Sequence, residues 1–154
     1  MKQPSSSGTQ LPADAGEAVQ AALGAEHAAV WVYELVSAFL PAGFDAPTQE
    51  GLTGHRARRD ATERLLAAGG LTPRPAEPAY LPPKPVTDQA SAIAVLITAE
   101  TDCGVAWRAA LERTDDATVR KAALDALTAA AVRATRWRKL GGVAPAAVPM
   151  PGMP

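Results

Sequence analysis

Residues 71–86 read LTPRPAEPAYLPPKPV, and this stretch decides how the rest of the chain can fold. Six of its sixteen residues are proline, which lacks a backbone N–H and is excluded from helix interiors and central strands. In polyproline geometry, at about 3.1 Å per residue, the segment reaches roughly 50 Å, whereas a helix of about 24 residues is only about 36 Å long. The segment can therefore run the full length of a helical bundle.

Apolar residues recur at the helical period on both sides of this segment, and no part of the chain shows sustained strand-like alternation. Helix-capping Asp and Thr residues and terminal Gly pairs bound four predicted helices, namely 14–40, 45–70, a third from 87 or 88, and a fourth from 116 to 142. The short links within each half predict two antiparallel helix pairs, and the proline-rich segment joins them. The expected fold class is therefore an all-α four-helix bundle with a long crossover between its second and third helices.

The chain has 154 residues, which is the usual size of one domain. We expect a disordered arm at 1–13, the bundle at 14–142 and a proline-rich tail at 143–154. The formal charge of −1 offers no basic surplus for nucleic acid or for an anionic membrane. The lone Cys103 and the absence of an apolar signal core favour a cytoplasmic protein, and no apolar run is long enough to predict a membrane span.

Two glutamates interrupt apolar helix faces near the middle of their helices. Glu26 falls within a face at the helix-packing period that otherwise contains only apolar residues and Tyr33, and Glu100 falls within the inward face of the third helix. A buried carboxylate without compensation is costly, so each should have a cation, a metal or a proton as partner. Arg59 lies 33 residues after Glu26, and Arg133 lies 33 residues after Glu100. We therefore expect ion pairs between Glu26 and Arg59 and between Glu100 and Arg133, in a shared polar core layer.

His55 lies one turn before Arg59 on the inward side of the second helix and is expected to join this layer. If a single metal ion were bound, its credible protein ligands would be Glu26, His55 and Glu100, a mixed nitrogen and oxygen set that suits iron, manganese or zinc. Cys103 has no evident histidine partner and is expected to be a buried, inert thiol.

The strings EHAAVWVYE, HRARRD, PAYLPPKPV and RATRWRKLGG, with Glu100 followed by Trp107, resemble the actinobacterial ferritin-like domains of unknown function. The resemblance covers residues 14–142 and implies a ferritin-like bundle. Di-iron members of that superfamily carry a lone Glu on the first and third helices and a Glu-x-x-His on the second and fourth. Glu26 and Glu100 match the lone glutamates.

The second and fourth helices depart from the di-iron pattern. Arg59-x-x-Thr62, or His55-x-x-Arg58 in a shifted register, stands on one helix, and Arg133-x-x-Arg136 stands on the other. An arginine has no lone pair to offer to iron. We therefore expect Glu–Arg ion pairs, with His55, in place of the di-iron site, and no cofactor.

Three functional readings follow. The first is a non-enzymatic interaction protein that forms a homodimer and whose specific ligand the sequence does not name. The alternative is an iron- or manganese-binding oxidoreductase with a reduced metal site. RNA binding by the basic runs at 56–59 and 133–139, with Trp137 stacking on a base, is a third and weaker option.

Overall fold

The computed structural model of the chain describes residues 10–154, and it is a bundle of four α-helices. The helices are α1 (Ala13–Val36), α2 (Asp45–Ala68), α3 (Gln89–Glu112) and α4 (Ala117–Leu140), and a 3-10 turn, η1 (Ala42–Phe44), precedes α2. No strand occurs within residues 10–154, so the all-α prediction is confirmed. The predicted N-terminal arm lies outside the described residues over positions 1–9.

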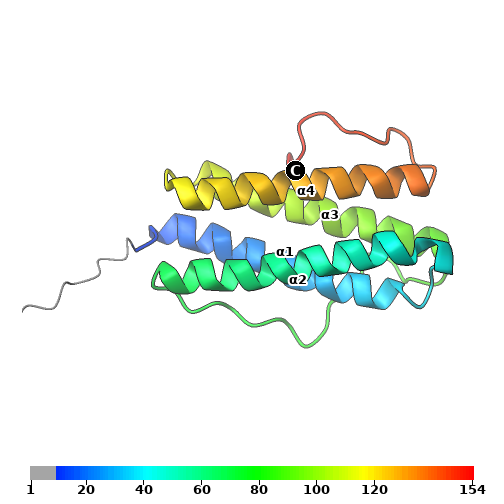
Figure 1. Cartoon of the computed structure of the whole chain (residues 1–154), viewed down its shortest axis with the longest axis horizontal. Helices are drawn as coiled ribbons and strands as arrows, with labels where there is room; N and C mark the ends of the chain where they lie inside the picture. The colour runs from blue at the N-terminus through cyan, green and yellow to red at the C-terminus, as the bar shows by residue number, and fades with distance from the viewer. Residues whose placement is uncertain (1–9) are drawn as a thin grey trace, which may run out of the picture.

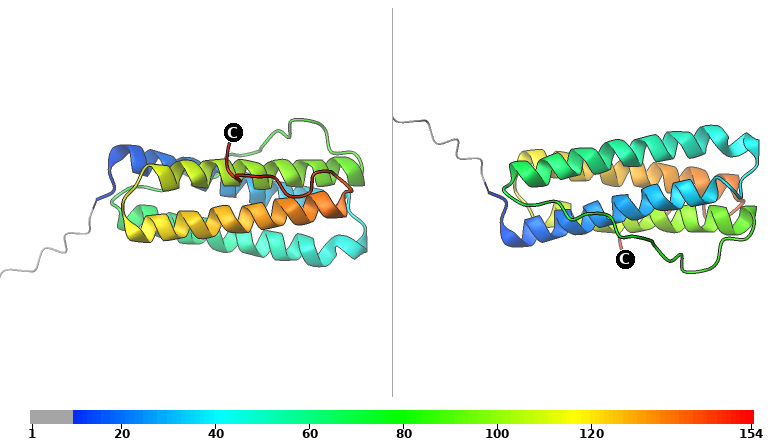
Figure 2. Two further views of the ribbon diagram at one scale, coloured as in Figure 1. Left: turned by 90° about the horizontal axis from the view of Figure 1, so that it is seen from above. Right: turned by 90° about the horizontal axis from the view of Figure 1, so that it is seen from below.

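The helices form two antiparallel pairs. α1 runs against α2, α3 runs against α4, and α2 and α3 point in the same direction (Figure 1). α1 packs on α2 and α3, and α3 also packs on α4. Residues 71–88 contain neither helix nor strand, and they carry the chain from the end of α2 along α1 to the opposite end of the bundle (Figure 2, right). Because α1 and α3 each pack on two helices, their facing sides form the centre of the core.

The connection between α2 and α3 is hydrogen-bonded to α1. The Gln20 side-chain amide donates to the carbonyl oxygen of Thr72 at 2.7 Å, and its oxygen accepts from the backbone N–H of Arg74 at 3.0 Å. The His27 ring nitrogen Nε2 lies 3.2 Å from the carbonyl oxygen of Arg74. Side chains of the neighbouring helix thereby satisfy backbone groups of a segment that has neither helical nor strand hydrogen bonding.

The capping predictions hold for the second helix pair only. Asp88 accepts from the backbone N–H of Ser91 in a reciprocal capping box, and Asp116 accepts from the backbone N–H of Val119 at the start of α4. α1 begins one residue before Asp14, and α2 begins at Asp45 itself, and neither helix has a side-chain cap. Asp14 and Asp45 therefore lie in the first turns of α1 and α2, where their negative charges interact favourably with the helix dipole and stabilise the helix.

Small side chains form the inward face of α4. Its large apolar residues Leu124 and Leu140 are 52% and 47% exposed. A row of alanines faces the core instead, namely Ala123, Ala126, Ala130 and Ala134. Small side chains let α4 approach α3 closely, so they define the packed face although they contribute little hydrophobic signal.

Residues 143–154 turn back over α3 (Figure 2, left). The Arg108 guanidinium donates to the carbonyl oxygen of Pro151 at 3.4 Å. Gly152 has φ +82°, and a Cβ there would lie 2.8 Å from the carbonyl oxygen of Gly104. The glycine therefore allows the tail backbone to lie directly on the helix.

α3 is the one described helix whose length and composition would also suit a membrane span. Half of its most apolar window is buried within the bundle, against α1 and α4. A core helix of a four-helix bundle has the same composition, because two of its neighbours cover its surface.

Candidate functional site

Three helices bring one ionisable side chain each to the centre of the bundle. Glu26 comes from α1, His55 from α2 and Glu100 from α3, and each is 1% exposed. The His55 imidazole lies between the two carboxylates, with Nδ1 2.7 Å from Glu26 Oε2 and Nε2 2.9 Å from Glu100 Oε1. We call these three residues the Glu–His–Glu layer. The predicted inward positions of all three are therefore correct.

Three aromatic residues add further hydrogen bonds to this layer. The Trp107 indole N–H donates to Glu26 Oε1 at 2.7 Å, and the Tyr33 hydroxyl donates to Glu100 Oε1 at 2.5 Å. The Trp137 indole N–H in turn donates to the Tyr33 hydroxyl oxygen at 2.8 Å. A helix-period pattern treats these residues as core packing, whereas their polar atoms anchor the layer from α1, α3 and α4. For Tyr33 and Trp107 the available signal was their place on the same helix faces as Glu26 and Glu100.

The geometry favours the imidazolium form of His55. A neutral imidazole has one N–H, so donating to a carboxylate from both nitrogens requires the imidazolium. Burial alone would lower the pKa of His55, but the hydrogen bonds to Glu100 and Glu26, together with their charges, raise it to about 9. Burial, followed by the charge of Glu100, also holds the pKa of Tyr33 above its usual value, so its hydroxyl keeps the proton that it donates.

One atom of the layer has no partner. Glu100 Oε2 is the single buried side-chain nitrogen or oxygen without a hydrogen bond among the residues that the structure describes. Glu26 is better satisfied, because Arg58 Nε also lies 4.0 Å from its Oε1. The charge of the layer is therefore balanced more completely on the α1 side than on the α3 side.

The predicted pair between Glu26 and Arg59 is wrong. The Arg59 guanidinium bonds to the neighbouring Asp60 at 2.8 Å and is 30% exposed. His55 fixes the inward direction of α2, and Arg58 and Arg59 follow it at about 300° and 400° of helix rotation, on opposite sides of that direction. Arg58 is the one on the side of Glu26, so the cation stands one residue earlier than the equal spacings suggested.

The predicted pair between Glu100 and Arg133 is also wrong. Glu100 pairs with His55, and no carboxylate within residues 10–154 pairs with Arg133. The Arg133 guanidinium lies against Gly54 of α2, where a Cβ would collide with it. Its charge still reaches the layer, because it lowers the pKa of Tyr33 against the larger effect of burial. Arg133 therefore lies beside the layer and is not part of its ion pairs.

The donor set does not fit a dinuclear iron centre. The chain has only two histidines, and the second, His27, contacts the α2–α3 connection. On α4 the only carboxylate is Asp125, which is exposed and pairs with Lys121 at 2.6 Å. Trp137 of α4 faces the layer instead, and an indole N–H cannot ligate a metal. The helix that should supply a Glu-x-x-His therefore supplies no ligand.

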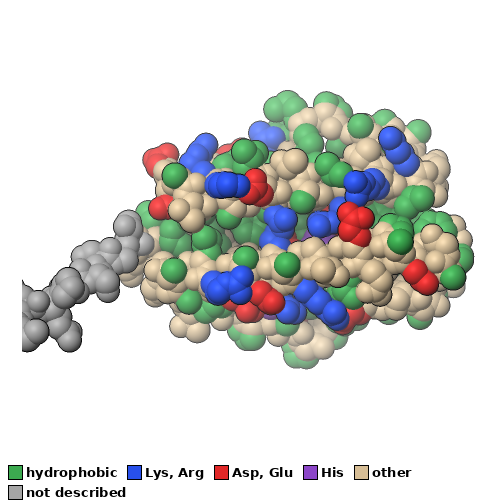
Figure 3. Space-filling view, in the orientation of Figure 1, with side chains coloured by type: hydrophobic (Ala, Val, Ile, Leu, Met, Phe, Trp, Pro, Cys, Tyr) green, Lys and Arg blue, Asp and Glu red, His purple; other side chains and the backbone are tan. Residues whose placement is uncertain are grey.

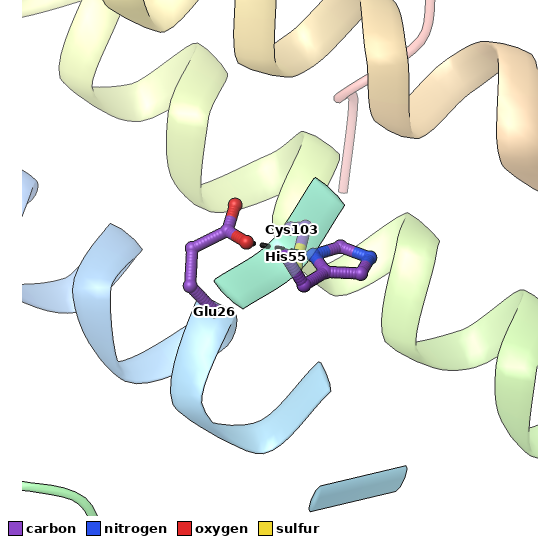
Figure 4. Close-up of side chains that lie close together, drawn as sticks. All are labelled: Glu26, His55 and Cys103. Atoms are coloured by element: carbon purple, nitrogen blue, oxygen red, sulfur yellow. Dashed lines mark hydrogen bonds and ion pairs between the residues drawn. The ribbon is translucent and has the colours of Figure 1, made fainter. Parts of the chain in front are cut away.

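A smaller donor set does exist. Ligand atoms of Glu26, His55 and Cys103 lie within 4.8 Å of one another, as Figure 4 shows for the three side chains. Burial, and then the negative charges of Glu26 and Glu100, keep the pKa of Cys103 well above its usual value, and its thiol points to the carbonyl oxygen of Ala25 at 3.5 Å. The proximity of Cys103 to the layer was not predicted, whereas its burial agrees with the expectation.

The comparisons with known proteins place the chain among proteins of undetermined function. A family described as "Domain of unknown function (DUF4439)" matches residues 18–154. The fold is similar to the crystal structure of a conserved hypothetical protein, Rv2844, from Mycobacterium tuberculosis, with a TM-score of 0.82 and 36% identity. The alignment covers 90% of this chain and 97% of that one. No curated protein matches the sequence.

Proposed function

The chain belongs to the family described as a domain of unknown function (DUF4439), and we propose that it is a ferritin-like bundle with a non-enzymatic binding role. In this proposal the Glu–His–Glu layer occupies the place where di-iron members of the ferritin-like superfamily hold metal. The helix directions and the long connection between α2 and α3 support the ferritin-like assignment. The positions of Glu26 and Glu100, near the middle of α1 and α3, support the placement of the layer.

The single observation that carries the proposal is the use of both His55 ring nitrogens. A metal-ligating histidine offers the lone pair of one nitrogen and donates a proton from the other. Here Nδ1 and Nε2 lie 2.7 and 2.9 Å from carboxylate oxygens, and in the proposed imidazolium each nitrogen donates a proton and neither has a free lone pair. The proton on His55 then does what a metal cation does in relatives, which is to hold two buried carboxylates together.

Elemental analysis tests the proposal. The chain is produced in medium supplemented with iron, manganese and zinc, purified without a chelator and analysed by mass spectrometry for metals. We expect a metal content far below one ion per chain and equal to that of a Glu26→Gln variant purified in parallel, because neither protein holds an ion in the layer. Two iron or manganese ions per chain, lost in the variant, would sink the proposal.

A second candidate function is binding of a single iron or manganese ion, as in an oxidoreductase with a reduced site. The observation in its favour is the proximity of the Glu26, His55 and Cys103 ligand atoms, with Glu100 on the other side of the imidazole. Such a site requires one His55 ring nitrogen to break its hydrogen bond to a carboxylate and bind the ion instead. It also requires Cys103 to lose its proton, although the pKa of the thiol is raised.

Replacement of Cys103 separates the two candidates in the same elemental analysis. In the single-ion case Cys103→Ser lowers the metal content, because oxygen replaces the thiolate ligand. If a proton on His55 joins the two glutamates and no ion is bound, the variant and the parent chain contain the same low background of metal.

A further inference from the structure

A groove separates α2 from α4. These two helices touch one another little, because α2 packs on α1 and α4 packs on α3. Between them lies an open cavity of about 450 Å³, which is within the size range of sites for small organic ligands. Figure 3 shows the hollow between the two helices, with green apolar atoms and blue Lys or Arg atoms inside it. We call it the α2–α4 groove.

The walls of the α2–α4 groove are mainly apolar. Ala57, Ala61 and Leu65 line it from α2, Ala122 lines it from α4, and Trp107 of α3 contributes to its lining. The acidic residue at its edge, Asp125, is exposed and pairs with Lys121. The groove therefore suits the apolar part of a ligand and offers no free acidic group to a cation.

Two arginines border this apolar surface. Arg58 lines the groove, and Arg133 lies against Gly54, which also lines it. Neither guanidinium makes a hydrogen bond to another side chain within residues 10–154, and the one ion pair of Arg58 is a 4.0 Å contact with Glu26. Their N–H donors are therefore available, and a planar guanidinium is well suited to a carboxylate.

The local charges favour an anion as well. With His55 as the imidazolium, three cations at this level of the bundle face only two carboxylates, Glu26 and Glu100. One further negative charge between Arg58 and Arg133 would balance the group. Charge balance in a partly buried site matters because neighbouring charges interact more strongly there than in water.

We propose that the α2–α4 groove binds a carboxylic acid with an apolar chain, with the carboxylate between Arg58 and Arg133 and the chain along Ala57, Ala61 and Leu65. The inference rests on the proposed binding role and names the class of ligand. The occupant is a free fatty acid or a similar amphipathic carboxylate, because the groove is mainly apolar and the two arginines beside it have free N–H donors.

Titration calorimetry with decanoate, below its micelle concentration, tests the inference. We expect saturable binding that decanol and acetate do not reproduce, since decanol lacks the charge and acetate lacks the chain. Arg133→Gln should weaken decanoate binding by about tenfold or more, the loss expected for a charged hydrogen bond. Arg136→Gln, one turn further along α4 at an exposed pair with Glu50, should leave the affinity within about twofold.

A second variant tests the apolar part without touching a charge. Ala61→Leu adds a side chain on the exposed groove wall of α2, where leucine suits a helix, so the protein stays folded while the groove is filled. Loss of decanoate binding in this variant supports the groove as the site. Absent binding to the parent chain, equal binding of decanol, or unchanged affinity in Ala61→Leu would each overturn the inference. The metal content tests the proposed function separately, so a metal-free protein that ignores decanoate refutes only the groove assignment.

Discussion

Replacement of His55 by alanine is expected to lower the free energy of unfolding by about 3–5 kcal/mol, the range measured when one partner of a buried ion pair is removed. The imidazole supplies the hydrogen bonds to both Glu26 and Glu100, which are 1% exposed. Without it, two buried carboxylates face each other with only their aromatic donors and the distant Arg58. Urea denaturation followed by circular dichroism measures the loss.

A surface pair provides the matched control for His55→Ala. Arg56, the next residue of α2, bonds to Glu34 of α1, and both side chains are 49% exposed. Arg56→Ala should change the stability by less than about 1 kcal/mol, because exposed pairs are screened by water. Equal losses in the two variants would mean that the layer contributes no more than an ordinary surface contact.

The loss caused by His55→Ala should also depend on pH. The pKa of His55 is raised from 6.5 to about 9 by the fold, so the imidazolium stabilises the folded state fully below pH 6.5. That contribution is lost as the pH rises through 9, because the folded imidazole then loses its proton too. The stability difference between the parent chain and the variant should therefore shrink over this interval.

Gly51→Ala is expected to destabilise the protein by about 1–3 kcal/mol, the usual range for overpacking a core. A Cβ at Gly51 would lie 2.6 Å from the Tyr33 hydroxyl and closer still to its ring. Tyr33 is fully buried, and its hydroxyl is held by Glu100 and Trp137, so the ring cannot turn aside without breaking both hydrogen bonds. Thermal denaturation of the variant measures the effect.

Another glycine in a helix shows what the same substitution does where space is available. A Cβ at Gly24 of α1 would meet nothing within 4 Å. Gly24→Ala should therefore stabilise the protein by up to about 1 kcal/mol, the difference in helix propensity. If Gly24→Ala stabilises the protein and Gly51→Ala destabilises it, the loss at Gly51 is due to the clash with Tyr33. Stabilisation by both substitutions would contradict a fixed Tyr33 in the layer.

The sequence predicts the architecture well because helix faces and breakers are local signals. The apolar period that contains Glu26 and Tyr33 indicates which face of the first helix packs inward. The prolines of residues 71–86 indicate an extended connection along the bundle. The inward face of α4 could not be predicted in the same way, because its alanines are too small to stand out against Leu124. Short side chains on that face are identified by their neighbours on α3, which only the folded structure supplies.

Three members of the site were predictable, but its two arginines and its hydrogen bonds were not. Burial of a carboxylate in an apolar face indicates that it needs a partner, and this argument correctly brought Glu26, Glu100 and His55 together. The partner cannot be chosen from spacing, because a shift of one residue turns a helix side chain by about 100°. For this reason the predicted partner of Glu26 was Arg59, whereas the arginine near Glu26 is Arg58. His55 contacts both glutamates because α1, α2 and α3 bring the three side chains to the same level of the bundle.

The central claim is that a proton on His55, and not a metal ion, joins the two buried glutamates. The most direct test is the ¹H–¹⁵N correlation of the imidazole nitrogens over a pH titration, with His27→Gln used to assign the two histidines of the chain. We predict that His55 carries protons on both nitrogens at neutral pH and titrates with a pKa of about 9. A His55 signal with one unprotonated nitrogen at neutral pH, whether free or bound to a metal, would contradict the claim.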